Sequence, residues 1–153
     1  MPPPIILSLA FALLLWAPFA AAQSNVGELL DAGAKKLSAD EFKEELVQRT
    51  LVGPTLSGGN LEVMYATTGV LAGIGSYAGH NLSVAPISGE WTIDDNGRIC
   101  TSMRMGAGGG ASPGLGVTLP PRCQFWFKYA EQYFLSDSDS DRRARVLRRT
   151  VKQ

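Results

Sequence analysis

Two cysteines are the residues best suited to chemistry in this chain of 153 residues, and they are Cys100 and Cys123. An exported chain enters an oxidising compartment, where two thiols without a third favour one intramolecular disulfide. Closing a loop of this size stabilises the folded state by ~3 kcal/mol if the effect is entropic. A cysteine-based metal site lacks ligands, because His80 is the single histidine and lies in another segment. We therefore expect a structural disulfide, no metal site and no cofactor.

His80 is the residue that any Ser-His-Asp hydrolase built on this chain must use as its base. The sequence has no Gly-x-Ser-x-Gly turn, the pattern that presents the nucleophilic serine in many hydrolases. A carboxylate such as Asp94 or Asp95 would have to orient the imidazole. A small hydrolase that uses His80 is therefore the less favoured function, and we predict no catalytic residue.

Three aspartates at alternate positions, Asp137, Asp139 and Asp141, match the start of a calcium-binding loop. Arg142 stands where such a loop needs its turn glycine, and Arg148 stands where it needs its last carboxylate. This excludes an EF-hand. We interpret the triplet as a solvated acidic turn that pairs with neighbouring arginines.

Arginines and aromatic residues are concentrated toward the carboxyl-terminal end of the sequence. Basic clusters attract lipid head groups, polyanions or acidic proteins. The glycine-rich segment 106–116 has few side chains that could pack, so we expect a loop there. The predicted contact surface combines this loop with Trp126, Tyr129, Tyr133, Arg142, Arg143, Arg145, Arg148 and Arg149. Because 14 basic residues balance 14 acidic ones, we expect no nucleic-acid partner.

The first 22 residues have the features of a signal peptide. An apolar run over residues 5–16 precedes Ala20 and Ala22, the small residues expected before a cleavage site. The residues before the run include no lysine or arginine, which departs from the usual pattern. A retained membrane anchor is the alternative, and the apolar run is short for one. We predict an exported protein, periplasmic or secreted, whose mature chain has no transmembrane span.

Residues 23–153 are predicted to form one domain, with a helical lead-in over 24–47 and a β core over 48–152. Apolar residues from Val26 to Leu37 recur at helical spacing after Ser24, a candidate N-cap. Ser38 and Glu41 have the spacing of a capping box, which predicts a second short helix.

The β core is predicted from alternating apolar residues and from turn sequences. The strongest pattern is a hairpin over residues 88–100, in which Asp-Asp-Asn-Gly separates two β-favouring runs. Aromatic strands follow over 123–129 and 133–135, and a final strand lies within 142–152. These elements predict an α+β fold whose antiparallel sheet is curved or closed into a small barrel.

Several short motifs resemble a known family. They are Leu-Val-Gly-Pro-Thr from Leu51, Gly-x-Trp-x-Ile from Gly89, Asp-x-Gly-x-x-Cys from Asp95, and the second cysteine, Cys123. From about Phe42 onward the chain resembles small secreted proteobacterial proteins that are grouped as a domain of unknown function. The glycine-rich insertion between the cysteines departs from that pattern. The resemblance implies an exported β-rich domain with one disulfide, and it supplies no catalytic residue.

A non-catalytic binding or interaction module is the function that these observations favour. An envelope-associated structural protein, held by its basic end, is the alternative from another class. The expected partner is an envelope component or another protein, whose identity the sequence does not specify.

Overall fold

The fold consists mainly of strands, whose side chains point alternately inward and outward. The computed structural model describes residues 23–76, 84–106 and 116–153. The predicted signal peptide, His80 and most of the glycine-rich segment lie outside the described residues. The described chain contains two helices, α1 (Val26–Asp31) and α2 (Ala39–Leu46), and ten strands: β1 (Lys35–Lys36), β2 (Thr50–Pro54), β3 (Asn60–Tyr65), β4 (Val70–Ser76), β5 (Val84–Ile93), β6 (Ile99–Met105), β7 (Val117–Thr118), β8 (Arg122–Tyr129), β9 (Gln132–Ser136) and β10 (Leu147–Val151).

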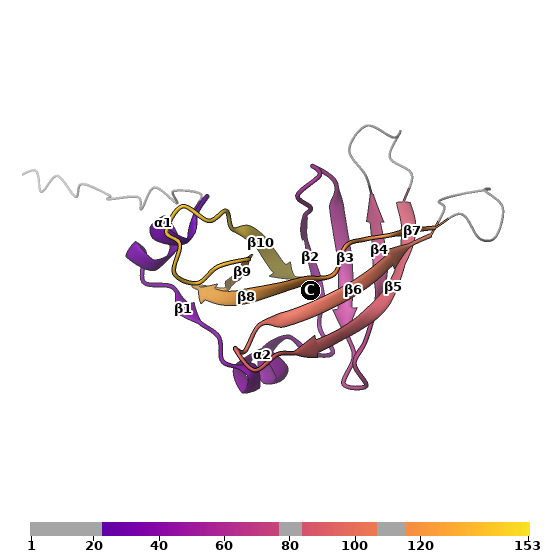
Figure 1. Cartoon of the computed structure of the whole chain (residues 1–153), viewed down its shortest axis with the longest axis horizontal. Coiled ribbons are helices and arrows are strands. Elements are labelled where there is room, and N and C mark those ends of the chain that lie inside the picture. The colour runs from indigo at the N-terminus through magenta and orange to yellow at the C-terminus, as the bar shows by residue number, and fades with distance from the viewer. Residues whose placement is uncertain (1–22, 77–83, 107–115) are drawn as a thin grey trace, which may run out of the picture.

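Eight of these strands close into an antiparallel barrel (Figure 1). Strands β2 to β6 each pair with the next along the chain, and β8 to β10 do the same. Two further pairings complete the ring: β10 with β2, where Thr150 lies opposite Val52, and β6 with β8, where Cys100 lies opposite Cys123. The predicted small antiparallel barrel is confirmed. The α+β description gave the helices too much weight, because the fold is mostly β.

Helix α2 covers one end of the barrel, at the bottom of Figure 1. Ser38 caps it, and the side chain of Glu41 accepts a hydrogen bond from the Ser38 amide, so the predicted capping box is confirmed. Phe42 is 1% exposed and lies 5.2–5.7 Å, between ring centroids, from three aromatic rings of the barrel interior: Tyr65, Trp91 and Trp126. This aromatic cluster fills the α2 end.

The α2 end is also held by a polar contact. The carboxylate of Glu45 on α2 accepts hydrogen bonds from Lys128 Nζ at 2.6 Å and from Tyr133 Oη at 2.8 Å. Both partners belong to the hairpin formed by β8 and β9. The contact therefore links the helix to the barrel wall.

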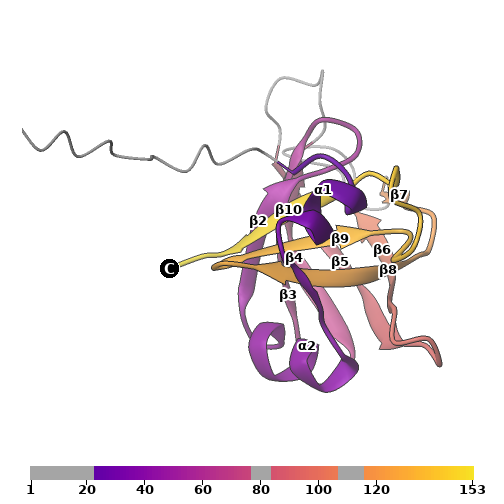
Figure 2. The ribbon, with the colours of Figure 1, turned by 90° about the vertical axis from the view of Figure 1, so that its left-hand side faces the viewer.

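Helix α1 packs on the outside of the same β8–β9 hairpin (Figure 2). A second apolar cluster forms there, made of Val26, Leu29, Phe127, Phe134 and Val146. This hairpin is therefore buried on both faces, which explains why the sequence places so many aromatic residues in it.

The first helix is shorter than predicted. Its N-cap is Asn25 rather than Ser24, and it ends at Asp31. Gly33 follows with a φ of +89°, a conformation that favours glycine and turns the chain away from the helix. Leu37 therefore lies outside this helix, where its amide donates to the Trp126 carbonyl oxygen at 2.8 Å.

Candidate ligand-binding cavity

The end of the barrel opposite α2 contains a cavity of about 570 Å³. Strand β3 runs from one end of the barrel to the other. It begins beside the cavity, which Leu61 lines, and it ends at Tyr65 in the aromatic cluster. The turn between β2 and β3, at the top of Figure 1, contributes Leu56 and Ser57 to the rim. Pockets for small molecules commonly measure about 300–1,000 Å³, so the cavity has the size of a ligand site.

The cavity wall is mainly apolar. Its apolar side chains come from β3, β6, β9 and β10, from the turn between β2 and β3, and from three residues before β8. They are Leu56, Leu61, Met103, Met105, Leu119, Pro120, Pro121, Leu135 and Leu147. Methionine side chains are flexible and polarizable, so they adapt to ligands of different shape. Such a wall favours an apolar molecule over a sugar or a nucleotide.

Arg149 is the buried charge of this cavity. It is 5% exposed, and its Nη1 donates to the carbonyl oxygens of Pro54 at 2.7 Å and Arg148 at 2.8 Å. Burial lowers the pKa of Arg149 to about 10, so the guanidinium still carries its charge at neutral pH. Tyr65, the group with which it interacts electrostatically, is neutral at that pH because burial raises its pKa to about 12.

Gly53 makes room for this arginine. A Cβ atom at position 53 would lie 2.3 Å from the Arg148 carbonyl oxygen and 2.9 Å from Arg149 Nη1. Real Cβ atoms do not approach backbone oxygen so closely, so a larger residue would displace the strand or the guanidinium. The motif that includes Gly53 therefore supports the position of Arg149.

Three residues of the predicted contact surface are not on the surface. Trp126 and Tyr133 are 4% and 7% exposed and pack inside the barrel, and Arg149 faces the cavity. The prediction of surface exposure was wrong for these three, because the strands that carry them alternate in a register that turns them inward. Tyr129 is half-buried against the α1 cluster.

The remaining arginines of that predicted surface are exposed. Arg142 forms an ion pair with Asp31 at 2.6 Å. The side chains of Arg143, Arg145 and Arg148 are exposed, and none of them forms an ion pair with another described residue. A basic surface therefore exists, and its binding role remains a prediction.

The aspartate triplet has the character of a solvated turn. Asp137 pairs with Arg122 at 2.8 Å, Asp139 pairs with Lys36 at 2.7 Å, and Asp141 accepts the amide of Arg143 at 2.9 Å. The carboxylates thus have separate partners. Nothing in this arrangement requires a calcium ion.

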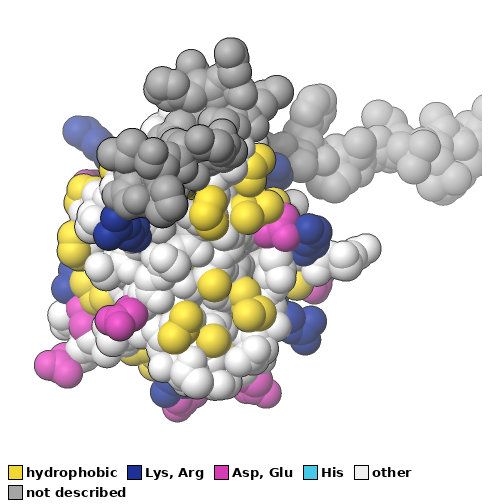
Figure 3. Space-filling view, turned by 90° about the vertical axis from the view of Figure 1, so that its right-hand side faces the viewer, with side chains coloured by type: hydrophobic (Ala, Val, Ile, Leu, Met, Phe, Trp, Pro, Cys, Tyr) yellow, Lys and Arg dark blue, Asp and Glu magenta, His cyan; other side chains and the backbone are white. Residues whose placement is uncertain are grey.

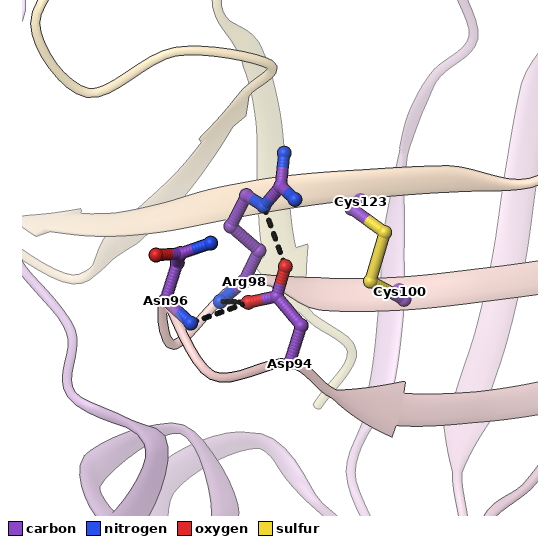
Figure 4. Close-up of a disulfide and its surroundings, with 5 residues drawn as sticks. All are labelled: Asp94, Asn96, Arg98, Cys100 and Cys123. Carbon is purple, nitrogen blue, oxygen red and sulfur yellow. Dashed lines mark hydrogen bonds and ion pairs between the residues drawn. A yellow bond between two sulfur atoms is a disulfide. The ribbon is translucent and has the colours of Figure 1, made fainter.

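The disulfide lies where β6 meets β8 (Figure 4). The two sulfur atoms of Cys100 and Cys123 are 2.01 Å apart, which confirms the predicted pairing. A carboxylate oxygen of Asp94 lies within 4.8 Å of both sulfurs. Because the sulfurs are bonded to each other, they are not thiolate ligands for a metal.

Asp94 belongs to the turn of the predicted hairpin, which the structure confirms. Its carboxylate accepts from the amides of Arg98 and Asn96 and from Arg98 Nε at 2.7 Å (Figure 4). These contacts, the Arg98 amide above all, lower the pKa of Asp94. The carboxylate is therefore committed to the turn. The Asp94 carboxylate therefore does not support the hydrolase hypothesis. His80, the base of that hypothesis, lies outside the described residues.

Apolar side chains are also exposed on the outside of the barrel. Val70, Ile74 and Val84 on β4 and β5 are 48%, 44% and 53% exposed. Figure 3 views the molecule from the side of β4, β5 and β7 and shows apolar side chains among largely uncharged surface. Any binding experiment must therefore distinguish the cavity from this outer face.

The chain matches no family model, no curated protein and no solved structure. The resemblance to secreted proteins of unknown function accordingly stays a prediction. Within the described residues, no helix has the length and apolarity needed to cross a membrane.

Proposed function

We propose that this protein is an exported, non-catalytic binding module that holds one small apolar molecule in the open end of its barrel. The observation that carries the proposal is the apolar cavity of about 570 Å³ at that end. Barrels of eight strands are wide enough inside to hold one small ligand. The aromatic cluster around Phe42 fills the other end, so within the described barrel the interior is open to a ligand at the end opposite α2.

The chemistry of the lining supports binding rather than catalysis. Its hydroxyl groups belong to Thr55, Ser57 and Ser76, and no histidine or carboxylate lines the described cavity to activate them. The signal-peptide pattern and the disulfide support an oxidising compartment outside the cytoplasm. This proposal moves the binding region from the predicted outer surface to the interior.

Titration of the purified protein with Nile red, a neutral apolar dye, tests the proposal. The dye should gain fluorescence with saturable, one-site binding. Met103→Trp enlarges a side chain of the cavity wall and should weaken binding at least about tenfold, a loss of ~1.4 kcal/mol. Ser102→Trp adds the same side chain to the exposed face of the same strand and should leave affinity unchanged.

Two results would overturn the proposal. One is the absence of saturable binding to the wild-type protein. The other is an equal loss in the Ser102→Trp and Met103→Trp proteins, which would place the dye on the outer face. If Met103→Trp does not fold, Leu61→Phe enlarges a side chain that β3 contributes to the same cavity and serves the same purpose.

A second candidate function is attachment to an acidic envelope component. The exposed side chains of Arg143, Arg145 and Arg148, which form no ion pair among the described residues, favour it. Binding to anionic vesicles should then weaken with salt and disappear when all three are replaced by serine. Vesicle binding that persists after the triple replacement would refute this role.

A further inference from the structure

Arg149 is a buried cation without a counter-ion in the described part of the chain. Its Nη1 hydrogen bonds end on two backbone carbonyl oxygens, and neither Nε nor Nη2 has an acceptor among the described residues. A buried guanidinium that lacks an acidic partner destabilises a fold. Its presence in a mainly apolar wall therefore requires a reason other than stability.

Among the described residues, no acidic side chain forms an ion pair with Arg149. The described lining of the cavity contains no aspartate or glutamate. The second arginine of the lining, Arg122, lies toward the rim and is already paired with Asp137 at 2.8 Å. Within the described lining, the cavity consequently has one uncompensated positive charge, and Arg149 carries it.

We propose that the ligand is a single-chain amphiphile whose anionic head group pairs with Arg149 while its apolar chain occupies the rest of the cavity. The inference rests on the proposed function, since it names the chemical class of the molecule bound at the same site. A guanidinium presents its N–H groups as a planar fork that matches two oxygens of a carboxylate or phosphate. The two unpartnered nitrogens of Arg149, Nε and Nη2, form one side of that fork.

The order of residues along β10 gives the orientation of the ligand. Inward-facing Leu147 lies toward the rim, and Val151 packs on the core, so Arg149 lies between the mouth and the filled end. The head group would enter first, and the chain would extend past Met103 toward the rim. This places the charge where water is excluded and ionic hydrogen bonds are strong.

Calorimetric titration with molecules that share one alkyl chain tests the inference. Dodecanoate and dodecyl phosphate carry an anionic head, dodecanol a neutral one and dodecylamine a cationic one. Dodecanoate or dodecyl phosphate should bind the wild-type protein about ten- to a hundredfold more tightly than dodecanol, as ionic hydrogen bonds allow. Dodecylamine should bind most weakly. Whichever anion binds more tightly identifies the head group as carboxylate or phosphate.

Two variants complete the test. Arg149→Met should abolish the preference for the anions while retaining dodecanol binding. Arg148→Met removes the same charge from the exposed neighbouring position and should keep the preference. Equal affinity of the wild-type protein for anions and dodecanol would overturn this inference and leave the proposed function standing, whereas no binding of any compound would overturn both. The wild-type comparison decides even if Arg149→Met does not fold.

Discussion

Replacing Phe42 by alanine should remove the packing that closes the α2 end of the barrel. The side chain is 1% exposed and contacts three aromatic rings. Truncating a buried phenylalanine costs about 3–5 kcal/mol, and each aromatic pair adds ~0.5–1.5 kcal/mol beyond burial. We therefore expect a loss in the upper half of the range for phenylalanine truncation, about 4.5 kcal/mol. For a domain of this size the melting temperature should fall by roughly 15 °C.

Urea unfolding followed by circular dichroism measures this loss directly. Glu44→Ala is the matched control, because Glu44 is an exposed residue of the same helix and its truncation should change stability by less than ~0.5 kcal/mol. Near-ultraviolet dichroism should also change for Phe42→Ala, since Trp91 and Trp126 lose a ring neighbour. A loss below ~1 kcal/mol with an unchanged urea dependence would refute the packing described for this end.

Three further predictions concern the contacts that hold the barrel together. Reducing the Cys100–Cys123 disulfide, which spans 23 residues, should lower the free energy of unfolding by ~3 kcal/mol, measured in urea with and without reductant; equal midpoints would contradict it. The hydrogen bond from Lys128 lowers the pKa of Glu45 below its ordinary 4.5, so its stabilisation is complete above that pH and is lost as the pH falls further. Glu45→Gln should therefore flatten the acid side of a stability–pH profile, and a profile identical to wild type would show that the pair contributes nothing. Ser38→Ala should cost ~1 kcal/mol in thermal unfolding through loss of the helix cap, and no change would argue against the capping box.

Features set by neighbouring residues were predictable from the sequence. The capping box at Ser38 and the hairpin turn at Asp94 depend on side chains bonding to amides a few residues away. The disulfide followed from the number of cysteines, because Cys100 had a single possible partner. Local rules also placed the final strand correctly.

Features set by distant pairing were not predictable in the same way. Barrel closure depends on β10 meeting β2, and nothing local specifies which edge strands pair. The aromatic run of β8 and β9 was interpreted as partly exposed because its rings are too dense along the chain for all of them to fit one core, but α1 forms a second apolar cluster on its outer face. Trp126 and Tyr133 were predicted on the surface, although both face the interior of the barrel and are buried.

The buried position of Arg149 could have been predicted from the sequence. Leu147, Arg149 and Val151 alternate with residues of the opposite face, so a strand through them places a cation among apolar residues. Grouping Arg149 with its neighbours as a basic end concealed that alternation. A charged residue on the apolar face of a predicted strand should therefore be predicted as buried, even when its sequence neighbours are exposed charges.

Methionine methyl resonances offer the most direct test of the central claim, that the cavity holds an apolar ligand. Among the described residues, Met103 and Met105 line the cavity, whereas Met64 lies on the opposite face of its strand from the buried Val63 and Tyr65. In protein with isotope-labelled methionine methyl groups, saturating dodecanoate should shift the Met103 and Met105 signals and leave the Met64 signal in place. Shifts confined to Met64, or no shift at any of the three at saturation, would contradict the account.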